Sequence, residues 1–166
     1  MPQKLILIHL KDDAVKGVYR PLFERDLITK LSKELKGLGH KSITRKYQRI
    51  FIEIDSNSKV KEIKEKLLSI KEINYFCFPK KLTNKIEEIK QHSLVLLKSS
   101  KASSFKPKIK LVYKAYPIKA KELTKEIGNY LIKQSKKTLD FIDPETTIYI
   151  EIMENASYAY DTVYKQ

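Results

Sequence analysis

The chain has 166 residues, enough for one ordinary domain or two small ones, and 42% of them are hydrophobic, which suffices for a core. Lysine and arginine outnumber aspartate and glutamate by 34 to 20, so the formal net charge is +14 and the expected partner is acidic: nucleic acid first, an anionic membrane second. No apolar run is long enough to span a bilayer, and the single cysteine, Cys77, excludes an internal disulfide and indicates a cytoplasmic protein.

The first half of the chain predicts strands that alternate with helices. Strands are expected over four segments: 5–10, 42–46, 49–55 and 74–78. One helix begins at Pro21, because proline suits a first helical turn, and Asp55 or Ser58 is expected to cap the other. Their apolar positions recur at helical spacing: Phe23, Leu27, Leu31 and Leu35, then Val60, Ile63, Leu67 and Ile70. The order β-α-β-β-α-β is typical of a ferredoxin-like domain.

After Pro79, where Lys80 and Lys81 suggest a linker or a domain boundary, a second pattern begins. Helices are predicted at 84–98 and 121–133, and strands at 105–113, 147–153 and 158–164, the last two joined as a hairpin. Gly128 lies within the second of these helices, which indicates close packing of helix on sheet. The fold class is therefore α+β.

The predicted strand at 105–113 has one apolar and one cationic face. Lys106, Lys108 and Lys110 alternate with Phe105, Ile109, Leu111 and Tyr113, and successive side chains of a strand point to opposite faces. Residues 98–137 hold twelve lysines against two acidic residues, Glu122 and Glu126. A row of charge on a rigid strand suits a phosphate backbone, whereas the alternative is a solvated surface of a lysine-rich protein.

Three stretches, in the expected order, resemble the tRNA 4-thiouridine synthetase family. Residues 16–24, with Arg20-Pro21 followed by Phe23-Glu24, resemble its amino-terminal signature. Residues 114–128 resemble the core motif of its THUMP domain, and residues 139–160 are similar to that domain's closing strands. The resemblance implies a ferredoxin-like domain at 1–79 packed on a THUMP RNA-binding domain, an α/β sandwich, at 80–166.

The implied function is a tRNA-binding module. It would capture the acceptor end of tRNA for 4-thiouridine modification by a downstream or separate catalytic domain. The alternatives are a stand-alone THUMP adaptor that recruits another tRNA-modifying enzyme, such as an acetyltransferase, and a small enzyme with an unrecognised site. The predicted RNA-binding residues are Lys108, Lys110, Lys114, Tyr116, Lys119, Lys121 and Arg20. Tyr116 either stacks on a terminal base or packs in the core, and Arg20 either binds phosphate or pairs with Glu24.

No catalytic pattern stands out. A Ser-Gly-Gly-x-Asp-Ser pyrophosphate loop and a sulfur-carrying cysteine loop are both missing from the sequence, and His9, His40 and His92 lack the spacing of metal ligands. We expect no enzymatic activity from the chain as it stands and no cofactor within it; the resemblance implies that ATP and a sulfur donor belong to a catalytic part. The expected partners are tRNA and a separate catalytic protein, with no membrane.

Overall fold

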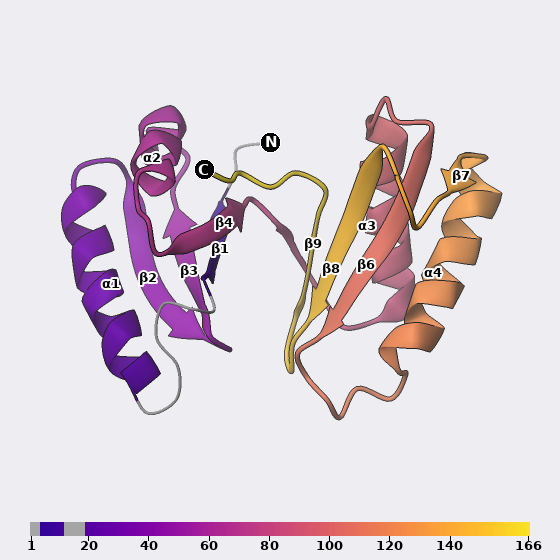
Figure 1. The fold of residues 1–166 in the computed structure, drawn as a ribbon, viewed down its shortest axis with the longest axis horizontal. Coiled ribbons are helices and arrows are strands. Elements are labelled where there is room, and N and C mark those ends of the chain that lie inside the picture. Colours follow the sequence, from indigo (N-terminus) through magenta and orange to yellow (C-terminus); the bar gives the residue numbers. More distant parts are fainter. Residues whose placement is uncertain (1–3, 12–18) are drawn as a thin grey trace. The chain divides into compact units, whose positions relative to one another are not determined.

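The computed structural model describes residues 4–11 and 19–166, so the Lys16-Gly17 pair of the first motif lies outside the described residues. The chain divides into two compact units. The first unit comprises the residues up to Pro79 together with Thr162–Gln166, and the second comprises Lys80–Asp161 (Figure 1). None of the described helices is long and apolar enough to cross a membrane.

The first unit has the ferredoxin-like order that the sequence predicts. Its elements are β1 (Leu5–Leu10), α1 (Arg20–Glu34), β2 (His40–Lys46), β3 (Arg49–Ile54), α2 (Val60–Leu68) and β4 (Ile73–Cys77). The strands form an antiparallel sheet in the order β2-β3-β1-β4, and both helices cover the same face of it (Figure 1). Leu27, Leu31, Ile63 and Leu67 from the helices pack with Ile6, Ile8, Ile50 and Ile52 from the sheet. The periodicity of 3.6 in the helices and 2 in the strands places these residues in one core.

The predicted cap of α2 is wrong. Lys59 precedes the helix without any side-chain cap, whereas the Ser58 hydroxyl donates to the carbonyl oxygens of Gly39 and Asp55 at 2.8 and 2.7 Å. The Asp55 carboxylate accepts the N–H of Asn57 at 2.8 Å, so both residues hold the preceding turn instead. Gly39 is required there, because its φ is +97° and a Cβ would lie 2.7 Å from the Ser58 Cα.

The carboxyl-terminal residues return to the first unit, although the sequence-based division placed them in the second. The expected strand at 158–164 is reduced to β9 (Ser157–Tyr160). Tyr164 instead pairs with Phe76: each backbone N–H donates to the other residue's carbonyl oxygen, at 2.9 and 3.0 Å, and the two rings stack 5.3 Å apart. The Lys64 ammonium lies 4.5 Å from the Tyr164 ring centroid, which adds a cation–π contact.

The second unit is a five-stranded sheet with two helices on one face (Figure 1). Its elements are β5 (Lys80–Leu82), α3 (Ile86–Ser99), β6 (Ser104–Leu111), α4 (Ala120–Ser135), β7 (Thr138–Leu139), β8 (Thr146–Ile152) and β9. The strand order is β5-β9-β8-β6-β7, with β6 parallel to both β7 and β8 and the remaining pairs antiparallel. Of the two alternatives for Lys80 and Lys81, the linker is wrong, since these residues form a strand that pairs with Ala159 and Tyr158. The second unit begins at Lys80.

The core of the second unit lies between that sheet and its helices. Ile89 and Leu97 of α3 and Leu123, Ile127 and Leu131 of α4 are buried with Phe105, Ile148 and Ile150 of the sheet. The β8–β9 hairpin is confirmed, since the N–H of Met153 donates to the carbonyl oxygen of Ala156 at 2.9 Å. The apolar periodicity therefore predicted both helices and their inward faces correctly.

Gly128 is buried on the sheet-facing side of α4, yet the packing leaves room for a methyl group. A Cβ there would lie 3.6 Å from Leu139 Cδ2 and 3.9 Å from Pro107 Cγ, which is ordinary van der Waals contact. We therefore expect Gly128→Ala to raise the free energy of unfolding by about 0.5–1 kcal/mol, because alanine is the better helix former. Urea unfolding followed by circular dichroism measures this change. Gly39→Ala is the opposite control and is expected to destabilise; a loss of stability with Gly128→Ala would contradict the geometry.

Candidate nucleic-acid interface

The strand β6 has the two faces that the sequence predicts. Phe105 and Pro107 are buried and Ile109 packs against the core of the second unit, whereas Lys108 and Lys110 are exposed. Lys106, which shares their parity, is half-buried. A strand of a hydrogen-bonded sheet holds its side chains in a fixed direction, so Lys108 and Lys110 present their charge from a rigid support.

Lys108 lies next to an aromatic pair on the neighbouring strands. In the parallel register it is opposite Tyr149 of β8, and its ammonium lies 5.9 Å from that ring's centroid. Tyr149 stacks on Tyr160 of β9 at a centroid distance of 4.9 Å, and the Tyr160 hydroxyl donates to the buried Glu151 carboxylate at 2.7 Å. The stem of Lys108 thus lies on a packed surface while its charge stays accessible.

The segment between β6 and α4 carries three further candidate residues, Lys114, Tyr116 and Lys119. Its beginning is anchored, because the N–H groups of Val112 and Tyr113 both donate to the carbonyl oxygen of Ile152, at 2.9 and 3.0 Å. Lys114 and Lys119 are exposed. Since β6 and β8 are parallel, their carboxyl ends meet at one end of the unit, where α4 begins (Figure 1).

The amino end of α4 favours an anion for two reasons. Lys119 immediately precedes the helix and Lys121 lies in its first turn, as predicted, and both side chains are exposed. No side chain caps this end, so its first backbone N–H groups remain available, and the helix dipole adds partial positive charge. Glu122 in the same turn is the one acidic residue between Lys106 and Lys125, a stretch with seven lysines.

In this structure Tyr116 packs, which is one of the two alternatives that the sequence left open. The ring packs against the core of the second unit, and the hydroxyl donates to the carbonyl oxygen of Asn84 at 2.6 Å. Burial, followed by the charges of Glu87 and Glu126, raises the pKa of Tyr116, so the hydroxyl stays protonated as a donor. Tyr116 therefore positions the loop between Lys114 and Lys119, and its ring is engaged in packing.

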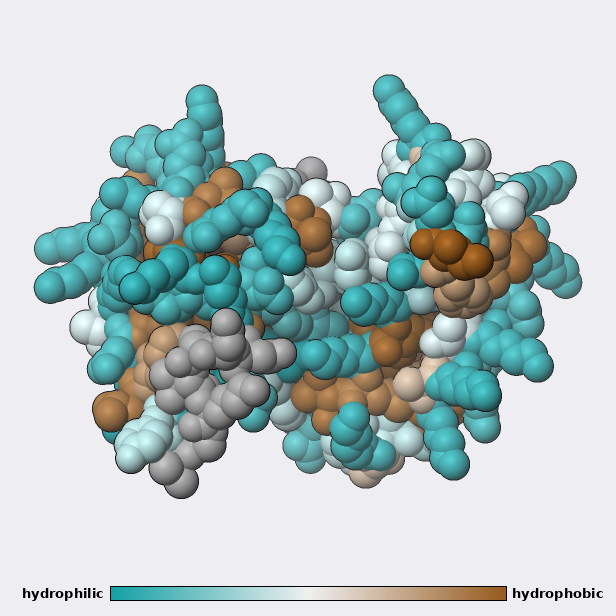
Figure 2. All heavy atoms as spheres, viewed as in Figure 1, coloured by the Kyte–Doolittle hydropathy of each residue, from teal (hydrophilic) through white to brown (hydrophobic). Residues whose placement is uncertain are grey.

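The five predicted lysines, Lys108, Lys110, Lys114, Lys119 and Lys121, form no ion pair with any residue that the structure describes. Other lysines have structural roles. Lys90 pairs with Glu126 at 2.9 Å, and Lys137 donates to the carbonyl oxygens of Leu97 and Ser100, at 2.7 and 2.8 Å, at the carboxyl end of α3. Hydrophilic side chains are spread over the visible face of the second unit (Figure 2). What distinguishes the five lysines is their position on β6 and at the start of α4.

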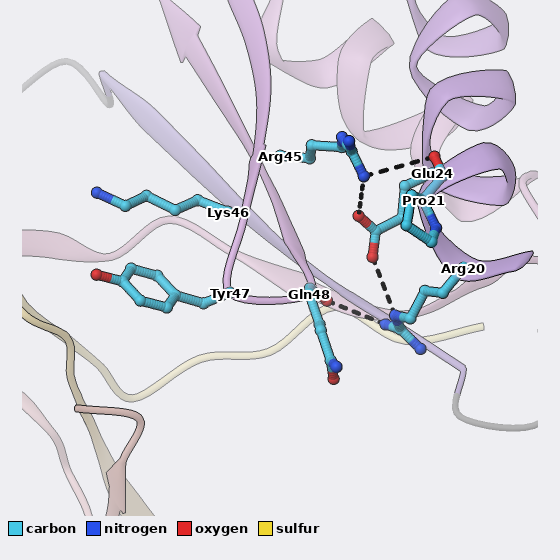
Figure 3. A pocket seen from close by; sticks show the side chains of 7 residues that line it. All are labelled: Arg20, Pro21, Glu24, Arg45, Lys46, Tyr47 and Gln48. Carbon is cyan, nitrogen blue, oxygen red and sulfur yellow. Dashed lines mark hydrogen bonds and ion pairs between the residues drawn. The ribbon is translucent and has the colours of Figure 1, made fainter. Parts of the chain in front are cut away.

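Arg20 lies in the first unit, at the start of α1, and the pairing with Glu24 is present. Its Nε donates to Glu24 Oε1 at 2.9 Å, and one terminal nitrogen donates to the Gln48 carbonyl oxygen at 3.1 Å (Figure 3). Arg45 of β2 donates to the other Glu24 oxygen at 3.3 Å. Sequence reasoning missed Arg45; its signal was a basic and aromatic run, Arg45 to Arg49, between two strands.

No group of three or more histidine, cysteine, aspartate or glutamate side chains could hold a metal ion within residues 4–11 and 19–166. Cys77 is buried in β4. His9 stacks on Tyr75 with ring centroids 4.4 Å apart, and His40 Nδ1 lies 3.2 Å from the Leu35 carbonyl oxygen. Burial, ring stacking or a polar contact within the fold therefore accounts for each of these three residues.

Fold and charge together define an α+β protein in which a ferredoxin-like unit is followed by a helix-on-sheet unit with exposed lysines at one end. Residues 5–77 match the family model of the ThiI ferredoxin-like domain. A probable tRNA sulfurtransferase from Clostridium perfringens is 31% identical over 155 residues, which cover 92% of this chain and 39% of the relative. The chain thus spans about two-fifths of the length of the curated relatives it matches.

Two solved structures share the fold. PH1313 from Pyrococcus horikoshii matches with a TM-score of 0.85 at 19% identity, over 98% of this chain and 55% of its own. A 4-thiouridine synthetase, solved as an RNA complex with bound ATP, matches with a TM-score of 0.76 at 21% identity, over 98% of this chain and 42% of its own. The predicted fold class is confirmed, and so is the predicted family likeness: residues 5–77 carry the ThiI ferredoxin-like domain, and 92% of the chain is similar to part of a tRNA sulfurtransferase.

Proposed function

We propose that the chain is a tRNA-binding module that holds the acceptor end of tRNA for 4-thiouridine formation. The observation that carries the proposal is the set of five exposed lysines without ion pairs among the described residues, on β6, on the segment after it and at the start of α4. The relatives named tRNA sulfurtransferases and the synthetase solved with RNA support tRNA as the ligand. Lysines on a rigid strand and backbone N–H groups at a helix start contact the phosphate backbone, so they recognise the shape of an RNA more than its base sequence.

The chemistry of sulfur transfer lies elsewhere in this proposal. ATP and a sulfur donor would act in a downstream or separate catalytic part, to which this module presents the tRNA. The packing of Tyr116 changes how the end is held: its hydroxyl is bound to Asn84 and its ring is packed, so phosphate contacts rather than stacking on this ring would carry the interaction.

The direct test compares intact tRNA with the same tRNA lacking its single-stranded 3′ end. We expect the trimmed tRNA to bind about tenfold or more weakly, as for the loss of one charged hydrogen bond to phosphate. Fluorescence anisotropy over a salt series measures both affinities. Five phosphate contacts predict a log–log slope of about −4, because each contact contributes about 0.7 to 0.9. Equal affinities for the two RNAs would remove end capture from the proposal.

A further inference from the structure

A hollow of about 440 Å³ lies in the first unit, between the start of α1 and the turn that joins β2 to β3. It is lined by Arg20, Glu24, Arg45, Lys46, Tyr47 and Gln48 (Figure 3). The lining has three cationic side chains and one carboxylate, an excess of two positive charges. Of these residues, the sequence predicted only Arg20 to bind RNA.

The buried carboxylate of Glu24 organises the two arginines. Its side chain is 6% exposed, and its two oxygens bind different guanidinium groups, Arg20 Nε at 2.9 Å and Arg45 Nη1 at 3.3 Å (Figure 3). A hydrogen bond to a charged partner fixes the plane of a guanidinium group, which reduces the entropy lost when that group binds a second anion. Glu24 therefore pre-orients both arginines at the hollow.

Each guanidinium group keeps donors for a ligand. Of the five N–H groups of Arg20, those on Nε and one terminal nitrogen are used, by Glu24 and the Gln48 carbonyl oxygen. Arg45 uses only Nη1 toward the residues that the structure describes, with the Pro21 carbonyl oxygen and Glu24 as acceptors. Paired N–H groups on a planar guanidinium match two oxygens of a phosphate group. The start of α1, which has no side-chain cap and no acidic residue in its first turn, adds partial positive charge.

The turn at the rim of the hollow has an unusual backbone. Tyr47 and Gln48 have φ values of +54° and +61°, the left-handed region that two-residue hairpin turns normally fill with asparagine and glycine. A tyrosine there is strained, and strain of this kind persists where the surroundings hold it and a function uses it. The Lys46 ammonium lies 5.1 Å from the Tyr47 ring centroid, and both side chains extend from the same side of the turn (Figure 3).

We infer that this hollow is a phosphate-binding site that takes a backbone phosphate of the bound RNA between Arg20 and Arg45. Lys46 and Tyr47 contact the adjoining nucleotide from the rim. The RNA as the source of the phosphate rests on the proposed function, whereas the anion chemistry of the hollow does not. The first unit thereby contributes a defined RNA contact of its own.

The test compares two arginine variants, Arg45→Gln and Arg25→Gln. Arg25 is exposed on α1 and does not line the hollow, so both variants lose one positive charge from the same unit. Arg45→Gln is expected to weaken tRNA binding about tenfold, as for one charged hydrogen bond, and to reduce the log–log salt slope by about one contact, while Arg25→Gln changes neither. Equal effects of the two variants would overturn the site.

A second variant, Glu24→Gln, tests whether orientation matters. The change removes one negative charge and so raises the net charge by one, which by itself predicts tighter tRNA binding. If Glu24 orients the arginines, binding weakens instead, about threefold or more, since about half of one charged hydrogen bond is lost. Thermal unfolding monitors the fold of each variant. Tighter binding by a folded Glu24→Gln variant would show that only bulk charge acts and would overturn the site.

Inorganic phosphate separates this inference from the proposed function. Titration of the chain at low salt, followed by NMR of the arginine Nε–H signals, is expected to shift the Arg20 signal in the original chain and not in Arg45→Gln. If inorganic phosphate shifts the Arg20 signal but tRNA does not bind, the proposed function is contradicted, and so is RNA as the source of the phosphate. The anion site itself would stand. If Arg45→Gln does not change tRNA binding and inorganic phosphate does not shift the Arg20 signal, the phosphate site is contradicted. The proposed function would stand.

Discussion

Ile127→Asp is expected to unfold the second unit. Ile127 is fully buried on α4, in an apolar core that it shares with Leu123, Leu131 and residues of the sheet. Placing an unpaired charge in that core and removing the apolar side chain costs about 4 kcal/mol or more, against a total stability of about 4 to 12 kcal/mol for a unit of this size. Urea unfolding and near-ultraviolet circular dichroism measure the loss.

Ile132→Asp is the matched control for this prediction. Ile132 lies on the same helix and is 37% exposed, so the same substitution leaves the new carboxylate in contact with water. The expected change in the free energy of unfolding is below about 1 kcal/mol. Comparable losses for the two variants would show that α4 does not bury the face assigned to it.

Reversing the charges of Lys110 and Lys114 to glutamate is expected to lower tRNA affinity at least about tenfold without unfolding the chain. Both side chains are exposed, one on β6 and one directly after it. The double variant loses two phosphate contacts, and the new carboxylates repel the backbone, so the log–log salt slope falls by roughly 1.4 to 1.8. Anisotropy titrations at several salt concentrations measure both quantities, and thermal unfolding checks the fold.

The control for the charge reversal is Lys98→Glu with Lys101→Glu. These lysines are also exposed and give the same change in net charge, but they lie near the carboxyl end of α3. The carboxyl end of α3 contacts Lys137, which lies just beyond the carboxyl end of α4. Lys119 lies at the other end of α4, a helix of 16 residues and about 24 Å, so the control pair is far from Lys119. An equal loss of tRNA affinity in both double variants would mean that only the net charge of the chain matters and not the position of Lys110 and Lys114.

The sequence predicted the fold wherever a long periodic pattern was present. The helices α1 to α4 and the strands β3 and β6 all carry apolar residues at the spacing of their secondary structure, whereas β2 has a single apolar residue, Ile43. The strands β5 and β7, with three and two residues, were missed because they are too short for a period. Their pairing depends on the neighbouring strands β9 and β6.

The candidate site was predicted in part. The parity of Lys108 and Lys110 follows directly from their alternation with apolar residues, and the structure places both on the exposed side of β6. For Tyr116, sequence reasoning left two alternatives, because an aromatic residue beside a proline suits both a loop and a core. The backbone acceptor that binds its hydroxyl, Asn84, is 32 residues away, and no local pattern indicates such a contact.

Local sequence determined the order of the elements, the inward face of each helix and the cationic face of β6, because these depend on the spacing of neighbouring side chains along one element. The tertiary structure alone decided that Arg45 joins Arg20 at Glu24, where Tyr116 packs and where the carboxyl-terminal residues pair. Those features join residues 21 to 88 positions apart, Glu24 with Arg45 and Phe76 with Tyr164 among them. Such residues come together only when the chain folds, because the packing of the whole core brings distant segments into contact. The secondary-structure preference of a single segment does not determine these contacts.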